Sequence, residues 1–175
     1  MFLNPSRVVE LLDVRSGMKV ADFGCGSGHF TVEMAKRVGG DGIVYAFDVQ
    51  KEALGALKSR SALENISNIE YRRVDLEIEG SSLLADNLVD IVLISNVLFQ
   101  VEDKKSFAKE AFRVLKSGGC VIFIDWNPSA DKLGPPQNMR IGEDEARVLF
   151  TGVGLVEDRG FKAGDSHYGL VFKKP

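Results

Sequence analysis

The chain has 175 residues, of which 45% are hydrophobic and 27% are charged. These proportions are those of an average soluble globular protein, so they exclude intrinsic disorder, collagen-like repeats and a membrane-spanning protein. The 22 basic residues nearly balance the 25 acidic ones, and a net charge of -3 disfavours nucleic acid as a partner. The length predicts a single domain over residues 1–175.

The cysteine content and the N-terminal residues bear on the compartment in which the protein works. Cys25 and Cys120 are the only cysteines, which is too few for a disulfide framework, and their spacing does not match a metal site. The first residues lack the charged segment and long apolar run of a signal peptide. We therefore expect a cytoplasmic protein with no metal and no membrane span.

Short apolar runs alternate with helical patterns along the chain. Asn4 and Pro5 predict the start of a first helix, because proline suits the first helical position. The predicted elements then follow in chain order: strand 19–23, helix 27–38, strand 43–47, helix 51–63, strand 69–74, strand 88–94, helix 103–116, a turn at 117–119, strand 120–125, helix 143–150, and strands 155–161 and 167–172. This alternation predicts a parallel sheet covered on both faces, a doubly wound α/β sandwich.

The densest signal is a glycine-rich loop between the first predicted strand and the next helix. Gly24, Gly26 and Gly28 let the backbone turn tightly and let a ligand approach it closely. A dinucleotide fingerprint would need glycine or alanine where His29 stands, and a phosphate-gripping loop would need a lysine after Gly28. The pattern, with Asp22 just before it, indicates a nucleotide-type cofactor without a pyrophosphate. The competing interpretation is an ordinary strand-to-helix turn.

Carboxylates follow the next two predicted strands. Asp48 lies 20 residues after Gly28, where an acid accepts hydrogen bonds from ribose hydroxyls, although it could equally cap the following helix. Val49 follows it, placed to flank a base. At the end of the third strand, Asp75 suits an adenine amino group and Leu76 suits its ring face, while a solvated loop acid is the alternative for Asp75.

Five blocks of sequence, taken together, resemble the class I methyltransferases that use S-adenosylmethionine. The blocks appear in the family's order, and the resemblance covers about residues 4–175; among subgroups it is most similar to small quinone-biosynthesis and arsenite types. The blocks are residues 20–30, 44–48, 73–76, 86–92 and 113–119. The resemblance implies a Rossmann-like, three-layer α/β/α sandwich with strand order 3-2-1-4-5-7-6 and strand 7 antiparallel.

The resemblance also implies roles for single residues. The three loop glycines would hold the methionine part and the ribose, and Asp22 would bind the methionine ammonium group, directly or through water. Asp48 would take the ribose diol. Ser95, at the end of the fourth strand, would lie under the methionine carboxylate and the methyl group. Asp75 and Leu76 would frame the adenine.

Methyl transfer from a sulfonium needs alignment above all, and a base only where the acceptor carries a proton. Asp125, His167 and Tyr168 lie at the presumed substrate rim and are candidate catalytic residues, with a structural hydrogen bond as the competing interpretation of each. Residues 127–141 form a long connection that could act as a short lid. The aromatic candidates near the sulfur, for which plain packing is the alternative, are Phe30, Phe99 and Trp126.

The sequence thus predicts a methyltransferase acting on an unidentified acceptor, with a small molecule favoured. Residues 95–98 lack the motif of enzymes that methylate exocyclic amines, and two cysteines are too few for an arsenite site. A non-catalytic module that binds S-adenosylmethionine is the alternative. A nicotinamide-dependent dehydrogenase is a further alternative, which His29 disfavours.

Overall fold

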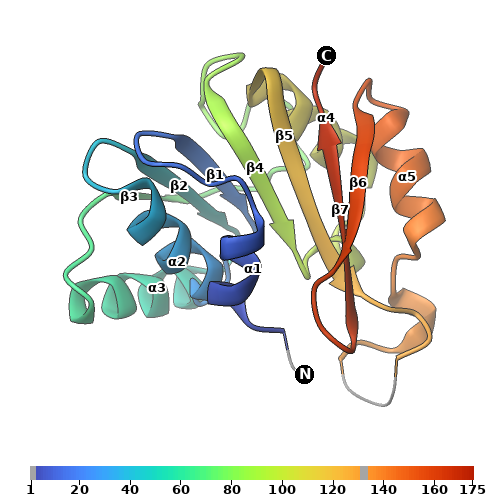
Figure 1. Cartoon of the computed structure of the whole chain (residues 1–175), viewed down its shortest axis with the longest axis horizontal. Helices are drawn as coiled ribbons and strands as arrows, with labels where there is room; N and C mark the ends of the chain where they lie inside the picture. Colours follow the sequence, from blue (N-terminus) through green and yellow to red (C-terminus); the bar gives the residue numbers. More distant parts are fainter. Residues whose placement is uncertain (1–2, 131–133) are drawn as a thin grey trace.

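A single mixed sheet organises residues 3–130 and 134–175, which are the residues that the computed structural model describes. The strand order is β3-β2-β1-β4-β5-β7-β6 (Figure 1). The first five strands run parallel, while β7 is antiparallel to both β5 and β6. The strands are β1 (Lys19–Phe23), β2 (Ile43–Asp48), β3 (Ile69–Arg73), β4 (Val89–Ser95), β5 (Leu115–Trp126), β6 (Val156–Lys162) and β7 (His167–Lys173). The predicted α/β fold and strand order are confirmed.

Helices cover both faces of the sheet and make the three layers. On one face lie α1 (Pro5–Leu11), α2 (His29–Val38) and α3 (Lys51–Leu63). On the other lie α4 (Lys104–Val114) and α5 (Glu143–Thr151), as Figure 1 shows. Two short 3-10 turns, Leu98–Gln100 and Gln137–Met139, complete the regular structure.

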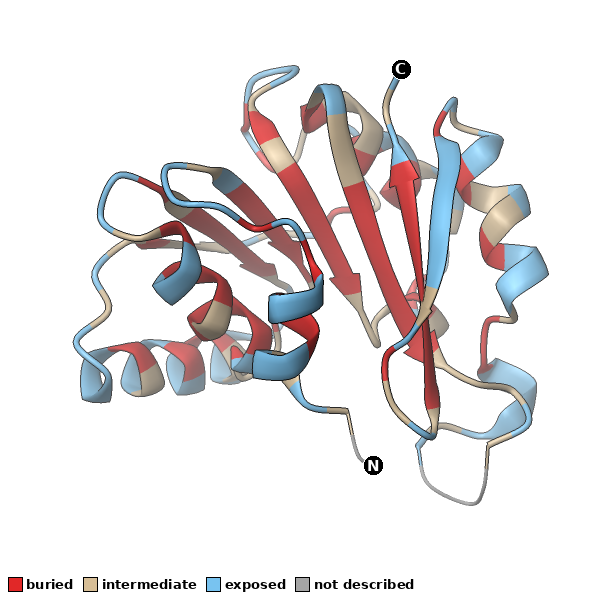
Figure 2. Ribbon diagram, in the orientation of Figure 1, coloured by how far each residue is buried: buried red, intermediate tan, exposed pale blue. Residues whose placement is uncertain are grey.

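The central strands are buried on both faces, which explains their nearly continuous apolar sequence (Figure 2). In β4, Leu93 packs into the core shared with α1, α2 and α3, whereas Val92 and Ile94 pack into the core shared with α4 and α5. This alternation is the two-residue period of a strand. Burial decreases from the central strands toward the sheet edge, and nearly all residues of the edge strand β6 are exposed.

Local sequence signals account for several helix ends. The Asn4 side chain accepts a hydrogen bond from the backbone N–H of Arg7, and Pro5 takes the first position of α1, as predicted. Asp103 caps α4 in the same way by accepting from the backbone N–H of Ser106.

One local prediction was wrong, because residues 117–119 are not a separate turn. They lie inside β5, where the register with β4 shifts between the pairs Val89–Leu115 and Ile91–Cys120. Gly118 takes a left-handed φ of +78° at this bulge. The backbone of residues 118–119 pairs with Lys174 near the C-terminus, so the segment stays extended and α4 ends at Val114 rather than at Lys116.

The topology brings several chain segments to one edge of the sheet. From β1 the chain proceeds to β2, while from β4 it proceeds to β5 on the other side, so the direction of winding switches between the adjacent strands β1 and β4. Open α/β sheets bind ligands at the carboxyl ends of the strands beside such a switch point.

Candidate functional site

A cavity of about 630 Å³ lies at the carboxyl ends of β1 to β4. Its size falls within the roughly 300–1,000 Å³ of ligand pockets. Its walls come from the segments that follow these four strands, and Leu3 and Pro5 close it from the N-terminal side. The cavity therefore occupies the switch point that the topology singles out.

The glycine-rich loop after β1 forms the floor of the cavity. The backbone N–H groups of Gly24 and Cys25 both donate to the carbonyl of Phe47 at the end of β2, at 3.0 and 2.8 Å. Gly24 has a φ of +81°, and a Cβ there would stand 2.5 Å from Cγ2 of Val97. Only glycine fits this position without strain, and the loop is thereby bound between the ends of β2 and β4.

Asp48 links the end of β2 to the same loop. One carboxylate oxygen accepts the backbone N–H of Gly26 at 2.9 Å, and the other accepts that of Gln50, also at 2.9 Å. The residue that caps α3 is Gln50, so the alternative of Asp48 as that helix cap is wrong. An ionised carboxylate offers about four acceptor positions, so Asp48 retains capacity for two further hydroxyl donors.

Asp22, at the end of β1, is a buried acid that lines the cavity. It is 2% exposed and accepts a hydrogen bond of 2.6 Å from the hydroxyl of Thr31. Burial raises the pKa of Asp22 to about 7, opposed by the Thr31 hydrogen bond and assisted by the nearby charge of Asp48. A cationic group in the cavity would favour the ionised form of this acid.

Two polar side-chain atoms at the end of β4 lack hydrogen-bond partners among the described residues. The Ser95 hydroxyl and the Asn96 carbonyl oxygen are buried and make no hydrogen bond among the described residues, and both residues line the cavity. Buried polar groups are nearly always paired, so such atoms at a cavity wall indicate a polar ligand.

The segment after β3 forms the opposite wall. Asp75 is exposed there and accepts the backbone N–H of Glu77 at 2.9 Å, while Leu76 beside it is 4% exposed. Val49, after β2, is 54% exposed and lines the same cavity. Two apolar side chains beside one carboxylate suit a flat heterocycle that carries an amino group.

The predicted binding residues converge on this cavity, with one exception. Gly28 is buried behind the loop, where a Cβ would stand 2.0 Å from Cδ1 of Leu57 in α3. The predicted binding residues that line the cavity are Asp22, Gly24, Gly26, Asp48, Val49, Asp75, Leu76 and Ser95.

The three candidate catalytic residues lie near the carboxyl end of β5 and are not among the residues that line the cavity. Asp125 is fully buried, and one of its oxygens accepts the backbone N–H of Trp126 at 2.7 Å. The other oxygen has no partner among the described residues, and burial raises the pKa of Asp125 to about 7. Tyr168 donates its hydroxyl to the carbonyl of Ile141 at 2.7 Å.

His167 packs on the indole ring of Trp126, with 4.1 Å between ring centroids. Both imidazole nitrogens lack a partner within the described part of the chain. Burial and the positive charge of Arg140 lower the pKa of His167 to about 4. The imidazole is therefore neutral at physiological pH. Of the aromatic candidates, Phe30 lines the cavity, and Phe99 and Trp126 do not.

The predicted lid at residues 127–141 is described only in part, because residues 131–133 lie outside the described residues. Arg140 holds the remainder: its guanidinium donates to the carbonyls of Asn127, Ala130 and Pro135 at 2.9–3.0 Å. The described residues of this segment do not line the cavity.

Sequence reasoning missed several residues at the cavity. Leu3 and Pro5 reach it from residues 1–16, a segment that the sequence offers as a possible cover of the site but without singling out either residue. Asn96 had one usable sequence signal, its position directly after Ser95 at the end of a buried strand. In the structure it adopts a left-handed φ of +55°. Within residues 3–130 and 134–175 there is no acidic, histidine or cysteine cluster fit to hold a metal. No helix in those ranges has the length and apolar character to cross a bilayer.

Comparisons with known proteins agree with the chemistry of the cavity. Residues 14–149 match the family model of a methyltransferase domain. The chain is 35% identical over 120 residues to a demethylmenaquinone methyltransferase of Staphylococcus aureus, an alignment covering 68% of this chain and 47% of that protein. It thus spans about half the length of this curated relative.

Solved structures give the same result over nearly the whole chain. A SAM-dependent methyltransferase from Aquifex aeolicus superposes with a TM-score of 0.88 at 26% identity, covering 97% of this chain and 89% of that one. The [4+2]-cyclase SpnF superposes with a TM-score of 0.80 at 15% identity, covering 97% and 81%, and shares the fold alone. The family match, the strand order and the cavity at the switch point lead to one conclusion: the chain belongs to the class I methyltransferases, whose cofactor is S-adenosylmethionine.

Proposed function

We propose that this chain transfers a methyl group from S-adenosylmethionine to a small-molecule acceptor. The observation that carries the proposal is the polar end of the cavity, where buried Asp22 lies near the unpartnered oxygens of Ser95 and Asn96. An acid together with hydrogen-bonding groups suits the ammonium and carboxylate of an amino acid. The cavity's other end, with Asp75 and two apolar side chains, suits a purine.

The residues divide the cofactor among them. In this proposal Asp22 binds the methionine ammonium, Ser95 lies beneath the methionine carboxylate, and Asp48 accepts from both ribose hydroxyls. Gly24 and Gly26 present bare backbone to the ligand. Asp75 accepts from the adenine amino group, and Val49 and Leu76 cover the ring faces. When bound, the cofactor supplies a sulfonium-activated methyl group, so the protein's contribution is alignment.

A quinone-class acceptor is the finer form of the proposal. It is supported by the demethylmenaquinone methyltransferases among the relatives. It is also supported by a second cavity of about 330 Å³ between α1 and the β6–β7 connection. Its walls contain the apolar residues Val8, Leu11 and Ala163 beside the charged residues Arg7, Lys162 and Asp165. Asn4 lines this second cavity, while its neighbours Leu3 and Pro5 line the first. An apolar acceptor held there would approach the cofactor beside the N-terminal segment.

The direct test is transfer of labelled methyl from S-adenosylmethionine to a panel of acceptors that includes demethylated quinols. We expect product with at least one quinol. S-adenosylhomocysteine that binds without turnover of any acceptor would instead support a non-catalytic binding module. That second candidate is favoured by one observation, since none of the three candidate bases lines the cavity. The fold alone does not decide between them.

Among the candidate bases, we propose Asp125 ahead of His167 and Tyr168. A pKa of about 7 leaves Asp125 half ionised at neutral pH, and its free oxygen lies one strand from Ser95. Asp125→Asn is expected to lower kcat about 10²-fold or more where the acceptor carries a proton, the low end of the range for general-base catalysis. Affinity for S-adenosylhomocysteine should not change. A kcat equal to that of the unaltered protein would remove Asp125 from the reaction.

The raised pKa of Asp22 leads us to expect that cofactor affinity depends on pH. Because its pKa is raised to about 7 in the free protein, the carboxyl is largely protonated below that pH and must lose its proton to pair with an ammonium group. Affinity for S-adenosylhomocysteine should therefore rise by up to about tenfold per pH unit from pH 5 toward pH 7 and then level off. Isothermal calorimetry across this range measures it.

Asp22→Asn supplies the control for the pH prediction. The amide has no titratable proton, so the affinity should be lower and nearly independent of pH. The sign of the stability effect is opposite: a buried acid with a raised pKa stabilises the fold at low pH, and this stability is lost as pH rises through 7. The stability of the unaltered, ligand-free protein should therefore fall between about pH 4 and pH 7, and the variant should lack this contribution to the decline. An unchanged pH dependence of binding would assign the titration to another group.

A further inference from the structure

The cavity wall formed by the segment after β3, where the proposed function places the purine, is the start of a connection without regular secondary structure. Asp75, Leu76 and Glu77 line the cavity, and they open residues 74–88, which the structure describes throughout and which contain no helix or strand. A backbone without regular structure has few hydrogen bonds of its own. Val74 donates its backbone N–H to the carbonyl of Asp48 at 3.2 Å, so the position of Asp75 depends on this bond and on what holds the rest of the connection.

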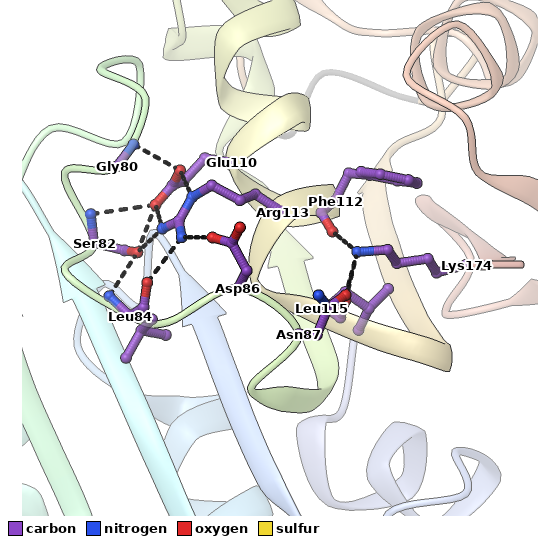
Figure 3. A network of polar contacts seen from close by, with 10 residues as sticks. All are labelled: Gly80, Ser82, Leu84, Asp86, Asn87, Glu110, Phe112, Arg113, Leu115 and Lys174. Atoms are coloured by element: carbon purple, nitrogen blue, oxygen red, sulfur yellow. Dashed lines mark hydrogen bonds and ion pairs between the residues drawn. The ribbon is translucent and has the colours of Figure 1, made fainter.

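Glu110 of α4 holds the middle of the connection (Figure 3). It is fully buried, and its carboxylate accepts the backbone N–H of Gly80 at 2.9 Å and that of Ser82 at 3.3 Å. The Ser82 hydroxyl donates to the same carboxylate at 2.5 Å. The Glu110 side chain thus supplies the hydrogen-bond partners that a helix or strand would otherwise give to these backbone N–H groups.

Arg113, one turn further along α4, completes the attachment. It pairs with Glu110 through two of its nitrogens, at 2.7 and 2.9 Å. A third nitrogen donates to the carbonyl of Leu84 at 2.8 Å and to the carboxylate of Asp86 at 2.5 Å (Figure 3). Bidentate pairing of this kind fixes geometry as well as charge.

The Glu110 carboxylate remains ionised despite its burial. Burial alone raises its pKa, but hydrogen bonds from Arg113, Ser82 and Gly80 outweigh it and bring the pKa of Glu110 to about 2. The network therefore keeps its charge throughout the pH range in which proteins are stable.

Short contacts connect this network to the cavity. The hydroxyl of Ser81, between Gly80 and Ser82, donates to the carbonyl of Asp75 at 2.6 Å. Glu77 accepts the backbone N–H of Asp103, the residue that caps α4, at 2.5 Å. Helix α4 therefore holds the connection at Glu77 and again at residues 80–86, directly after the cavity residues Asp75 and Leu76.

From these contacts we propose that Glu110 and Arg113 are positioning residues that set how selectively the site recognises its purine base. Neither residue lines the cavity. They act by holding residues 80–84, and through Ser81 they hold Asp75 where it can accept from an exocyclic amino group. This inference rests on the proposed function, because it assumes that the cavity binds S-adenosylmethionine.

The test compares two ligands that differ at one position of the base. S-inosylhomocysteine carries an oxygen where S-adenosylhomocysteine carries the amino group. We expect the unaltered protein to prefer the adenosyl compound about tenfold, the effect of one hydrogen bond to a charged acceptor. In Glu110→Gln this preference should fall several-fold toward equality. KM for S-adenosylmethionine should rise, and kcat at saturating cofactor should stay within about twofold.

Two further variants keep the result interpretable. Ser82→Ala removes the hydroxyl bond to Glu110 together with the bonds that this hydroxyl accepts from Arg113 and from the backbone N–H of Leu84. It keeps the Glu110 side chain, and it should reduce the preference in the same direction if Glu110→Gln does not fold. Lys174→Ala is the matched control. Lys174 donates to the carbonyls of Phe112 and Leu115 at the end of α4 (Figure 3). It also donates to the Asn87 side chain, at the end of the connection away from Asp75. Its loss should therefore lower thermal stability and leave the ligand preference unchanged.

The outcomes separate this inference from the proposed function. If the unaltered protein binds neither ligand, the proposed function fails. If it binds both but does not distinguish them, or if Glu110→Gln and Ser82→Ala distinguish them as well as the unaltered protein does, the positioning role is overturned. A reduced preference in Lys174→Ala as large as that in Glu110→Gln would also overturn it, since general destabilisation would then explain both.

Discussion

Asp48→Ala is expected to remove most of the stabilisation that S-adenosylhomocysteine gives the protein. The substitution removes the proposed acceptor of both ribose hydroxyls and also the bonds from the backbone N–H groups of Gly26 and Gln50. Hydrogen bonds to a charged group contribute about 1.5–3 kcal/mol each, so losing two weakens binding about 100-fold or more.

Thermal unfolding at a fixed ligand concentration measures this loss. At a concentration of about 100 times its dissociation constant, the ligand should stabilise the unaltered protein by about 2.7 kcal/mol, and the variant at the same concentration by only about 0.4 kcal/mol. Asp41→Ala is the matched control, because Asp41 is an exposed aspartate just before the opposite end of the same strand β2. A full ligand response in Asp48→Ala would contradict the assignment of Asp48.

Gly28→Ala is expected to destabilise the fold itself by about 2–5 kcal/mol, as the sum of left-handed strain and overpacking. Gly28 has a φ of +82°, and a Cβ there would stand 2.0 Å from Cδ1 and 2.9 Å from Cγ of Leu57. Leu57 is fully buried between α3 and the sheet, so it has little room to move. Urea-induced unfolding of the ligand-free protein gives the free energy directly.

Two other variants distinguish crowding from backbone strain. At Gly26, with a φ of +53°, an added Cβ would meet no atom within 4 Å. Gly26→Ala should therefore cost only about 1–2 kcal/mol of strain, and, since Gly26 lines the cavity, it should weaken ligand binding more than it weakens the fold. Leu57→Ala combined with Gly28→Ala should cost less than the sum of the single changes. Strictly additive losses would argue against a clash with Leu57.

The parts of the site that were predictable from sequence are those that follow strand ends. Asp22, Asp48, Asp75 and Ser95 each lie at the end of a strand or just after one, and parallel strands bring their carboxyl ends to one edge. Position in the chain placed Asp22, Asp48 and Asp75 at one edge, whereas the resemblance to the methyltransferase family added Ser95. The same reasoning identified the glycine loop, although it did not reveal that Gly28 packs against Leu57 rather than facing the ligand.

What escaped prediction depends on contacts between distant segments. Glu110 and Arg113 read as ordinary charged positions of an amphipathic helix, and nothing in their spacing indicates that they hold residues 80–86. The partner of the Tyr168 hydroxyl is a backbone carbonyl, that of Ile141, which carries no sequence signal at all. The bulge at residues 117–119 resembled a turn because a glycine pair is typical of both.

The bonds that Asp48 makes have a consequence for the thermodynamics of binding. Because its carboxylate already orders the loop at Gly26 and the start of the next helix at Gln50, this part of the site forms when the chain folds and not when a ligand arrives. The conformational entropy of ordering the loop is then lost when the chain folds, so ligand binding does not carry this entropic cost. The ribose end of the site is thus already ordered in the free protein, because Asp48 holds the loop before the ligand binds.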